Sequence, residues 1–115
     1  MSQLTKIVHD PIQKVRVVLL GYSGSEEKPP FLELVEPVGD TSPVTRFLKN
    51  NNVIYHYCIE TTNIQESLAI SRKNKCIIVQ KPVPAKLFND RHIAWILTPE
   101  KYLIEFLETE NTNNI

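Results

Sequence analysis

The sequence is poor in cysteine, glycine and net charge, and each shortage excludes a class of protein. Its 115 residues include two cysteines, Cys58 and Cys76, which are too few for a disulfide framework. Both lie in apolar runs, so we expect reduced, buried thiols and a cytoplasmic protein. Thirteen basic residues balance thirteen acidic ones, so the sequence predicts no positive surface for nucleic acid or an anionic membrane.

Long hydrophobic runs and short catalytic signatures are also missing. No run approaches the ~18 apolar residues that a membrane span needs, and residues 1–14 lack the apolar core of a signal peptide. The sequence contains no phosphate-binding glycine loop, no nucleophile elbow and no cysteine-based zinc signature. The sequence therefore predicts a protein that is neither secreted nor embedded in a membrane.

What remains is an ordinary globular composition, 42% hydrophobic and 23% charged, which predicts one domain over residues 1–115. Short runs rich in valine and isoleucine predict strands at 6–9, 14–22, 31–36, 53–60, 75–80, 91–97 and 102–108. Ser42-Pro43 predicts the start of a short helix. Thr62 and Gln65 form a capping box for a helix over 63–73, whose buried face is Ile64, Leu68 and Ser71. We expect Pro82 to end the strand at 75–80.

The two halves of the sequence resemble each other. The segment KIVHDP matches CIIVQKP, which aligns His9 with Gln80, and each segment leads through a long apolar strand to an apolar-Glu-apolar strand. The glutamates of these strands are Glu33 and Glu105. The second copy, 53–108, opens with a strand and a helix that the first copy, 4–37, lacks. The sequence therefore predicts one complete module and one incomplete module.

Three side chains are candidates for chemistry: Glu33, His56 and Glu105. Each lies in the middle of a predicted strand, with apolar residues two positions away on the same face. A carboxylate in such a place is costly unless it faces water, finds a partner or binds a cation. If the two modules pair about a pseudo-twofold axis, the three side chains meet in one concave sheet. Two carboxylates and an imidazole suit a borderline divalent metal.

The structural alternative stays open at this point. A glutamate in a strand often faces water from a half-exposed sheet, and a lone strand histidine is often a hydrogen-bonded structural residue. His9 and His92 are expected at the surface, near a turn and a strand start.

Four segments carry a resemblance to a known family. Residues 54–60, followed by Asn63-Ile64 and a helix, are similar to the "LHHICIEV-x-DI" strand of the vicinal oxygen chelate superfamily, in its glyoxalase and methylmalonyl-CoA epimerase-like branch. The other three segments resemble its "IELLEP" strand, its "SPI-x-x-FL" helix and its "VLIEL" strand: residues 31–37, 42–48 and 102–105. The resemblance covers about residues 6–108. It implies an α+β fold of βαβββ modules that curl into a partly open barrel around a metal site.

The resemblance also implies a ligand set. The family's metal positions fall on Glu33, His56 and Glu105, with Glu33 or Glu105 as the catalytic base and a divalent Zn, Ni, Co, Mn or Mg ion as cofactor. The family's remaining ligand is a histidine on the opening strand of the first module, which has no counterpart in this sequence. His9 aligns with a different strand and does not replace it.

The implied activity is metal-dependent proton transfer next to the carbonyl of a small thioester or hydroxy-carbonyl substrate, as in a lyase or isomerase. Two alternatives stay open: a non-enzymatic module that holds a small apolar or planar ligand, and a degenerate fragment without a competent metal site. The missing opening strand leaves a sheet edge unpaired, so we expect a homodimer.

Overall fold

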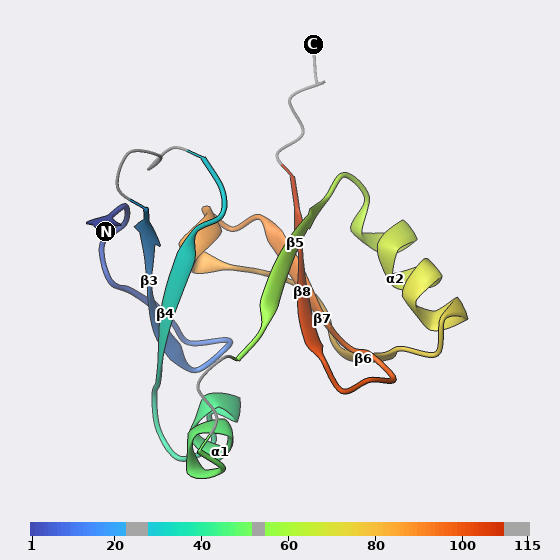
Figure 1. Ribbon diagram of the computed structural model, residues 1–115, viewed down its shortest axis with the longest axis horizontal. Helices are drawn as coiled ribbons and strands as arrows, with labels where there is room; N and C mark the ends of the chain where they lie inside the picture. Colours follow the sequence, from blue (N-terminus) through green and yellow to red (C-terminus); the bar gives the residue numbers. More distant parts are fainter. Residues whose placement is uncertain (23–27, 52–54, 110–115) are drawn as a thin grey trace. The chain divides into compact units, whose positions relative to one another are not determined.

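Two four-stranded sheets organise the chain in a computed structural model that describes residues 1–22, 28–51 and 55–109 (Figure 1). The chain divides into two compact units, Met1–Val53 and Ile54–Ile115, and each holds one sheet. Neither sheet closes on itself through the strand pairings of the described residues. None of the described helices is both long and apolar enough to cross a membrane.

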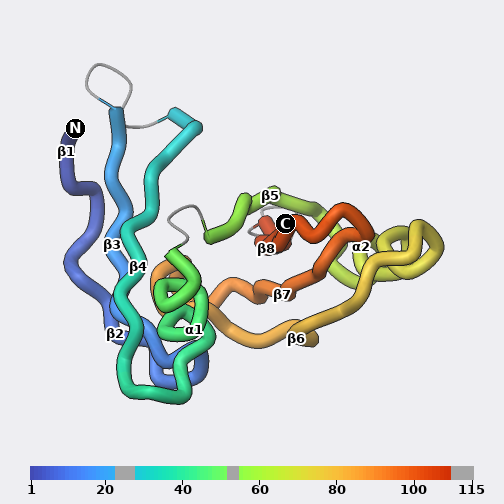
Figure 2. The backbone as a smooth tube through the Cα atoms, turned by 60° about the horizontal axis from the view of Figure 1, so that its bottom comes forward, coloured from blue at the N-terminus to red at the C-terminus, as the bar shows by residue number. Residues whose placement is uncertain are grey.

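The first unit is an antiparallel sheet built on strand β3. Its elements are β1 (Ser2–Gln3), β2 (Val8–Asp10), β3 (Val15–Gly21), β4 (Leu32–Pro37) and helix α1 (Pro43–Lys49). Strands β1 and β2 pair with successive parts of β3, and β4 pairs along the length of β3 (Figure 2). Ser42 caps α1 as expected, because its hydroxyl accepts the Val44 N–H at 3.3 Å with proline in the first turn.

A buried carboxylate holds the turn between β2 and β3. Asp10 is 1% exposed, and its side chain accepts the backbone N–H groups of Ile12 and Gln13 and the Gln13 side-chain amide. Several N–H donors offset the cost of burying this charge. Asp10 is therefore a structural residue of the first unit.

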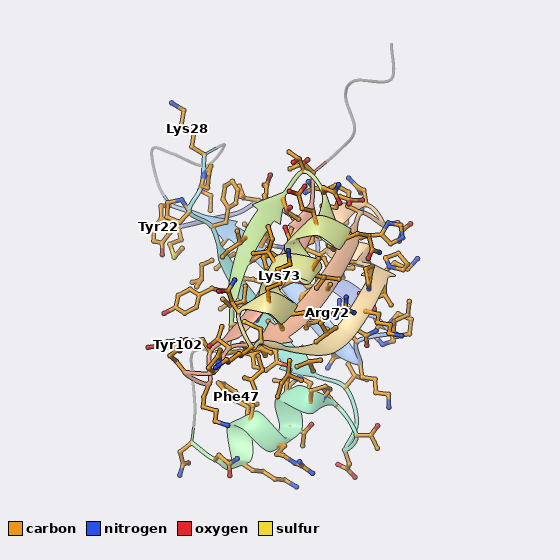
Figure 3. All side chains as sticks on the ribbon, turned by 90° about the vertical axis from the view of Figure 1, so that its right-hand side faces the viewer. Tyr22, Lys28, Phe47, Arg72, Lys73 and Tyr102 are labelled. Carbon is orange, nitrogen blue, oxygen red and sulfur yellow. The ribbon has the colours of Figure 1, made fainter. Side chains whose placement is uncertain are left out.

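The second unit is a βαβββ module. Its elements are β5 (Tyr57–Thr61), α2 (Ile64–Lys73), β6 (Ile77–Pro84), a 3₁₀ turn η1 (Lys86–Phe88), β7 (His92–Leu97) and β8 (Leu103–Glu108). The strand order is β5-β8-β7-β6, with β5 parallel to β8 and the other neighbours antiparallel. Figure 3 looks onto α2, which carries the exposed Arg72 and Lys73 on its outer side.

Helix α2 covers one face of its sheet. Ile64 and Leu68 pack with Ala94 and Ile96 in a buried cluster, against which Ile104 and Phe106, among others, also pack. The buried residues of α2 are Ile64, Leu68 and Ser71, which confirms the face predicted from the sequence. The predicted cap is wrong by one residue. The helix begins at Ile64, so Asn63 is the residue whose side chain reaches the Glu66 N–H, at 3.1 Å.

Two strand predictions need correction. Strand β6 continues through Pro82 to Pro84, because it lies at the edge of the sheet and its ladder shifts register around Gln80. Strand β5 begins at Tyr57, so His56 precedes it instead of lying mid-strand. Among the described strands β5 borders only β8, which itself begins at Leu103 and offers little backbone for pairing before Tyr57. The N-terminal part of the expected strand, Val53 and Ile54, lies outside the described residues.

The register of the strand ladders shows which residues hold equivalent positions in the two sheets. Glu33 lies opposite Leu19, and Glu105 lies opposite Trp95, in matching antiparallel pairs. The same ladders correct the alignment of His9. His9 is exposed and lies opposite Arg16, which is three residues before Leu19. Pro84 lies opposite His92, which is three residues before Trp95. His9 therefore corresponds to Pro84 and not to Gln80.

Candidate functional site

The candidate site lies on the face of the second sheet that α2 does not cover. Because side chains alternate along a strand, Glu105 points away from its neighbours Ile104 and Phe106, which pack toward α2. Glu105 pairs with Cys58 on β5 and with Trp95 on β7, and Trp95 pairs in turn with Gln80 on β6. These four side chains form a polar and aromatic row across the sheet.

Glu105 and His56 meet on this face. The Nε2 atom of His56 lies 3.3 Å from Oε1 of Glu105, and the two side chains are 9% and 4% exposed. Glu105 is therefore buried, unlike a glutamate on a solvated sheet face. Two of the three side chains singled out from the sequence come together within one unit.

Two aromatic rings pack beside His56, and sequence analysis singled out neither as a site residue. The Trp95 ring lies edge-on to His56 at a centroid distance of 4.5 Å, and Tyr55 lies 5.2 Å from His56 and 5.9 Å from Trp95. Burial, and secondly the negative charge of Glu105, raises the pKa of the Tyr55 phenol. Trp95 could have been found only from its register opposite Glu105, which is a tertiary property.

Glu33 lies in the first unit, on β4 beside Val35 on the half-buried face of its sheet. Its position in the ladder matches that of Glu105. Since Glu33 belongs to the other unit, its convergence with His56 and Glu105 stays a prediction. Within each unit, the described residues contain no group of three or more His, Cys, Asp and Glu side chains that could hold a metal.

The His56–Glu105 pair fits part of a divalent metal site. Oε1 of Glu105 is buried and accepts no hydrogen bond from the described residues, and an imidazole lies beside it. A buried carboxylate oxygen needs a positive or hydrogen-bonding neighbour. One nitrogen and one oxygen donor are the ligands that borderline divalent ions use, and such a site needs at least one further ligand.

The cysteines differ from the expectation of buried thiols. Cys58 is exposed and Cys76 is half-buried, and neither is in a disulfide. Strand β5 is an edge strand of its sheet, and residues 57–60 are all exposed. Cys58 therefore lies at the open end of the polar row.

The site and the sheets together define an α+β protein with one βαβββ module and one further antiparallel sheet, and with a buried His-Glu pair on the face of the module's sheet that α2 does not cover. The comparisons with known proteins agree. Residues 2–95 match the profile of the Glyoxalase/Bleomycin resistance protein/Dioxygenase superfamily, and the chain belongs to this superfamily. The expected fold class is thereby confirmed, and each of the two sheets is open in the pairings of its described strands. Members of this superfamily typically bind a divalent metal.

One curated relative is the mouse (Mus musculus) protein named "Methylmalonyl-CoA epimerase, mitochondrial". It is 32% identical to this chain over 76 residues, which cover 64% of this chain and 40% of the relative. The chain therefore spans less than half the length of that relative.

Proposed function

We propose that this protein is a glyoxalase- or epimerase-like protein that moves a proton next to the carbonyl of a small thioester or hydroxy-carbonyl compound. The observation that supports the proposal best is the buried His56–Glu105 pair at 3.3 Å on the face opposite α2. The name of the mouse relative favours a thioester among these substrates. The proposal assigns an isomerase or lyase reaction.

In this proposal His56, Glu105 and Glu33 would hold a divalent ion. When bound, the ion draws electron density from the substrate carbonyl and so acidifies the neighbouring C–H group. One of the two carboxylates takes the proton, the C–H electron pair delocalises onto the carbonyl oxygen, and the proton returns to carbon. Trp95 and Tyr55 exclude water around the pair and strengthen its electrostatic interactions. Convergence of the two units as one domain is part of the proposal.

Metal binding tests the ligand assignment. Co²⁺ is titrated into the full chain while its single tryptophan, Trp95, reports the site by fluorescence. We expect His56→Gln and Glu105→Gln each to weaken Co²⁺ binding at least ~10-fold. The matched controls His92→Gln and Glu100→Gln alter exposed residues and leave binding unchanged. Binding that survives both site substitutions would contradict the assignment.

Glu33→Gln measures the contribution of the first unit in the same titration. A loss of affinity comparable to that of Glu105→Gln supports a shared site, whereas unchanged affinity removes Glu33 from the ligand set. Thermal unfolding of each variant without metal shows whether the fold is kept.

Proton exchange tests the reaction. In D₂O with Co²⁺, the protein is expected to exchange the α-hydrogen of a methylmalonyl thioester for deuterium, as NMR detects, and Glu105→Gln or Glu33→Gln abolishes the exchange. If the protein binds metal but exchanges no hydrogen of thioester or hydroxy-carbonyl probes, the metal assignment stands and the proposed enzymatic activity is contradicted.

A binding module for planar ligands is the second candidate, favoured by the three rings of Tyr55, His56 and Trp95. It predicts that a planar aromatic compound quenches Trp95 fluorescence without added metal. A cytoplasmic location and a homodimer remain predictions from the sequence, and the mass in solution tests the latter.

A further inference from the structure

The first sheet has an apolar face with no helix lying along it as α2 lies on the second sheet, among the described residues; α1 contacts β4 and adds Leu48 to the surroundings of this face. The ladders place Leu34 and Leu32 of β4 where Phe106 and Ile104 of β8 lie, and Val18 of β3 where Ala94 of β7 lies. In the second sheet these positions pack against α2, and Ala94 is fully buried. In the first sheet Leu34 is 51% exposed and Leu32 is 39% exposed. Equivalent apolar faces therefore have different surroundings.

A groove runs along this exposed face. It has a volume of about 570 Å³, and its apolar walls include Ile7, Val18, Leu34 and Leu48. Ile7 and Leu48 are also largely exposed. An apolar surface of this kind, with several large exposed side chains side by side, is typical of a binding surface.

A carboxylate marks one end of the groove. In the second unit, Oε2 of Glu108 accepts the N–H of Ile64, the first residue of α2, at 3.0 Å. Glu36 holds the equivalent ladder position in β4, lines the groove and pairs with Arg16 in an exposed ion pair. A carboxylate is favourable at the positive N-terminal end of a helix. Glu36 thus matches the charge of an arriving helix N-terminus.

The backbone edge of β4 matches as well. In the second sheet, β5 pairs in parallel with the outer edge of β8. Strand β4 has only β3 as a neighbour among the described strands. Its outer edge therefore carries no ladder to another described strand, and an edge strand of this kind can pair with an added strand.

We propose that this edge and groove bind a strand-helix segment of a separate partner polypeptide. The segment pairs in parallel with β4 over about five residues, as β5 does with β8, and continues as an amphipathic helix of about ten residues, as α2 does. The apolar side of that helix covers Leu32, Leu34 and Val18, and its first N–H group is bound by Glu36.

A second copy of this chain is a poorer occupant. Its own strand-helix segment, β5 and α2, is already seated on β8 and on the buried Ala94 and Ile96. Exchange of that segment would uncover one apolar face in order to cover another. A dimer through β4 is therefore the competing outcome of the test.

A tethered probe tests the proposal. Residues 55–75 of this chain, which include β5 and α2, are joined ahead of Met1 of the full chain by a long Gly-Ser linker, because tethering raises the effective concentration. We expect slower amide hydrogen exchange in β4 and a Tm higher by ~5 °C or more, with no increase in the number of chains per particle. In the host chain, Leu34→Lys abolishes both changes and Glu36→Gln reduces them.

The matched control carries the same probe with Ile64→Asp and Leu68→Asp in the added copy alone, so that its helix loses the apolar side. This control is expected to behave like the untethered chain. Unchanged β4 exchange with the intact probe overturns the proposal. So does protection of β4 in the untethered chain that grows with protein concentration and accompanies a doubled mass, since a second copy then covers the edge. No metal or substrate is needed, so failure here is separate from failure of the proposed function.

Discussion

The two sheets share a strand ladder but differ in what covers them. In the second unit α2 packs on Ala94 and Ile96, and Glu108 fixes the start of that helix. In the first unit the matching face exposes Leu34, and the matching carboxylate, Glu36, pairs with Arg16. The comparison shows that similar apolar patterns produce a core only where a covering element is present, because burial and not pattern supplies the stabilisation.

The largest contrast is expected from the same substitution in both units. Leu68→Ala creates a cavity under α2 and should cost ~2–5 kcal/mol of unfolding free energy, because Leu68 is 2% exposed. Leu34→Ala removes an exposed side chain and should cost less than ~1 kcal/mol. Urea unfolding measures both. Equal losses would show that the face of the first sheet is covered in solution.

In the first unit Asp10 stabilises the turn between β2 and β3, and its substitution should cause the next largest loss of unfolding free energy. Asp10→Ala leaves the amides of Ile12 and Gln13 without their acceptor and should cost ~1–3 kcal/mol. Asp40→Ala, at an exposed position, is the control and should change the unfolding free energy by less than ~0.5 kcal/mol. If both substitutions act alike, the turn does not depend on this carboxylate.

Glu108 and Glu36, which hold equivalent positions, should differ by a smaller amount in the unfolding free energy lost on substitution by alanine. Glu108→Ala removes the acceptor of the Ile64 N–H and should cost ~0.5–2 kcal/mol. Glu36→Ala breaks only an exposed ion pair and should cost less than ~0.5 kcal/mol in moderate salt. Thermal unfolding at two salt concentrations distinguishes the two contributions, because salt screens the exposed ion pair of Glu36. A large cost at Glu36 would mean that it already caps a bound helix.

The smallest expected effect is a pH dependence in the second unit. The pKa of Tyr55 is raised above its ordinary value of 10.0, so below that value the phenol is neutral in both the folded and unfolded states. At higher pH it ionises first in the unfolded chain, and the free energy of unfolding falls as pH rises. Tyr55→Phe should remove this part of the alkaline loss.

Denaturation curves at several alkaline pH values measure that slope. Tyr57→Phe is the matched control because the Tyr57 side chain is exposed. Identical slopes for Tyr55→Phe and the unchanged protein would contradict the assigned burial of Tyr55.

Much of the fold was accessible from local pattern. The periodicity of residues 63–73 predicted α2 and its buried face, and the Val- and Ile-rich runs located β3, β4, β7 and β8. The errors arose at boundaries, where neighbours decide. Strand β6 tolerates Pro82 because it is an edge strand, and β1 exists through its pairing with Leu20 and Gly21.

The candidate site was accessible only in part. Repetition and the period of two selected Glu105 and His56, and the structure brings them together. Tyr55 and Trp95 were missed because no local signal places a ring beside a carboxylate from another strand. Strand register decides that contact.

The sequence by itself determined both α-helices, most of the strands and the carboxylates that recur at equivalent places, because side-chain periodicity and turn chemistry act over a few residues. Only the tertiary structure decided that Glu105 is buried against His56 and Trp95 while the face around Leu34 stays open. Burial and partner choice depend on strand order, register and the helix that lies on each sheet, and these bring together residues far apart in the chain.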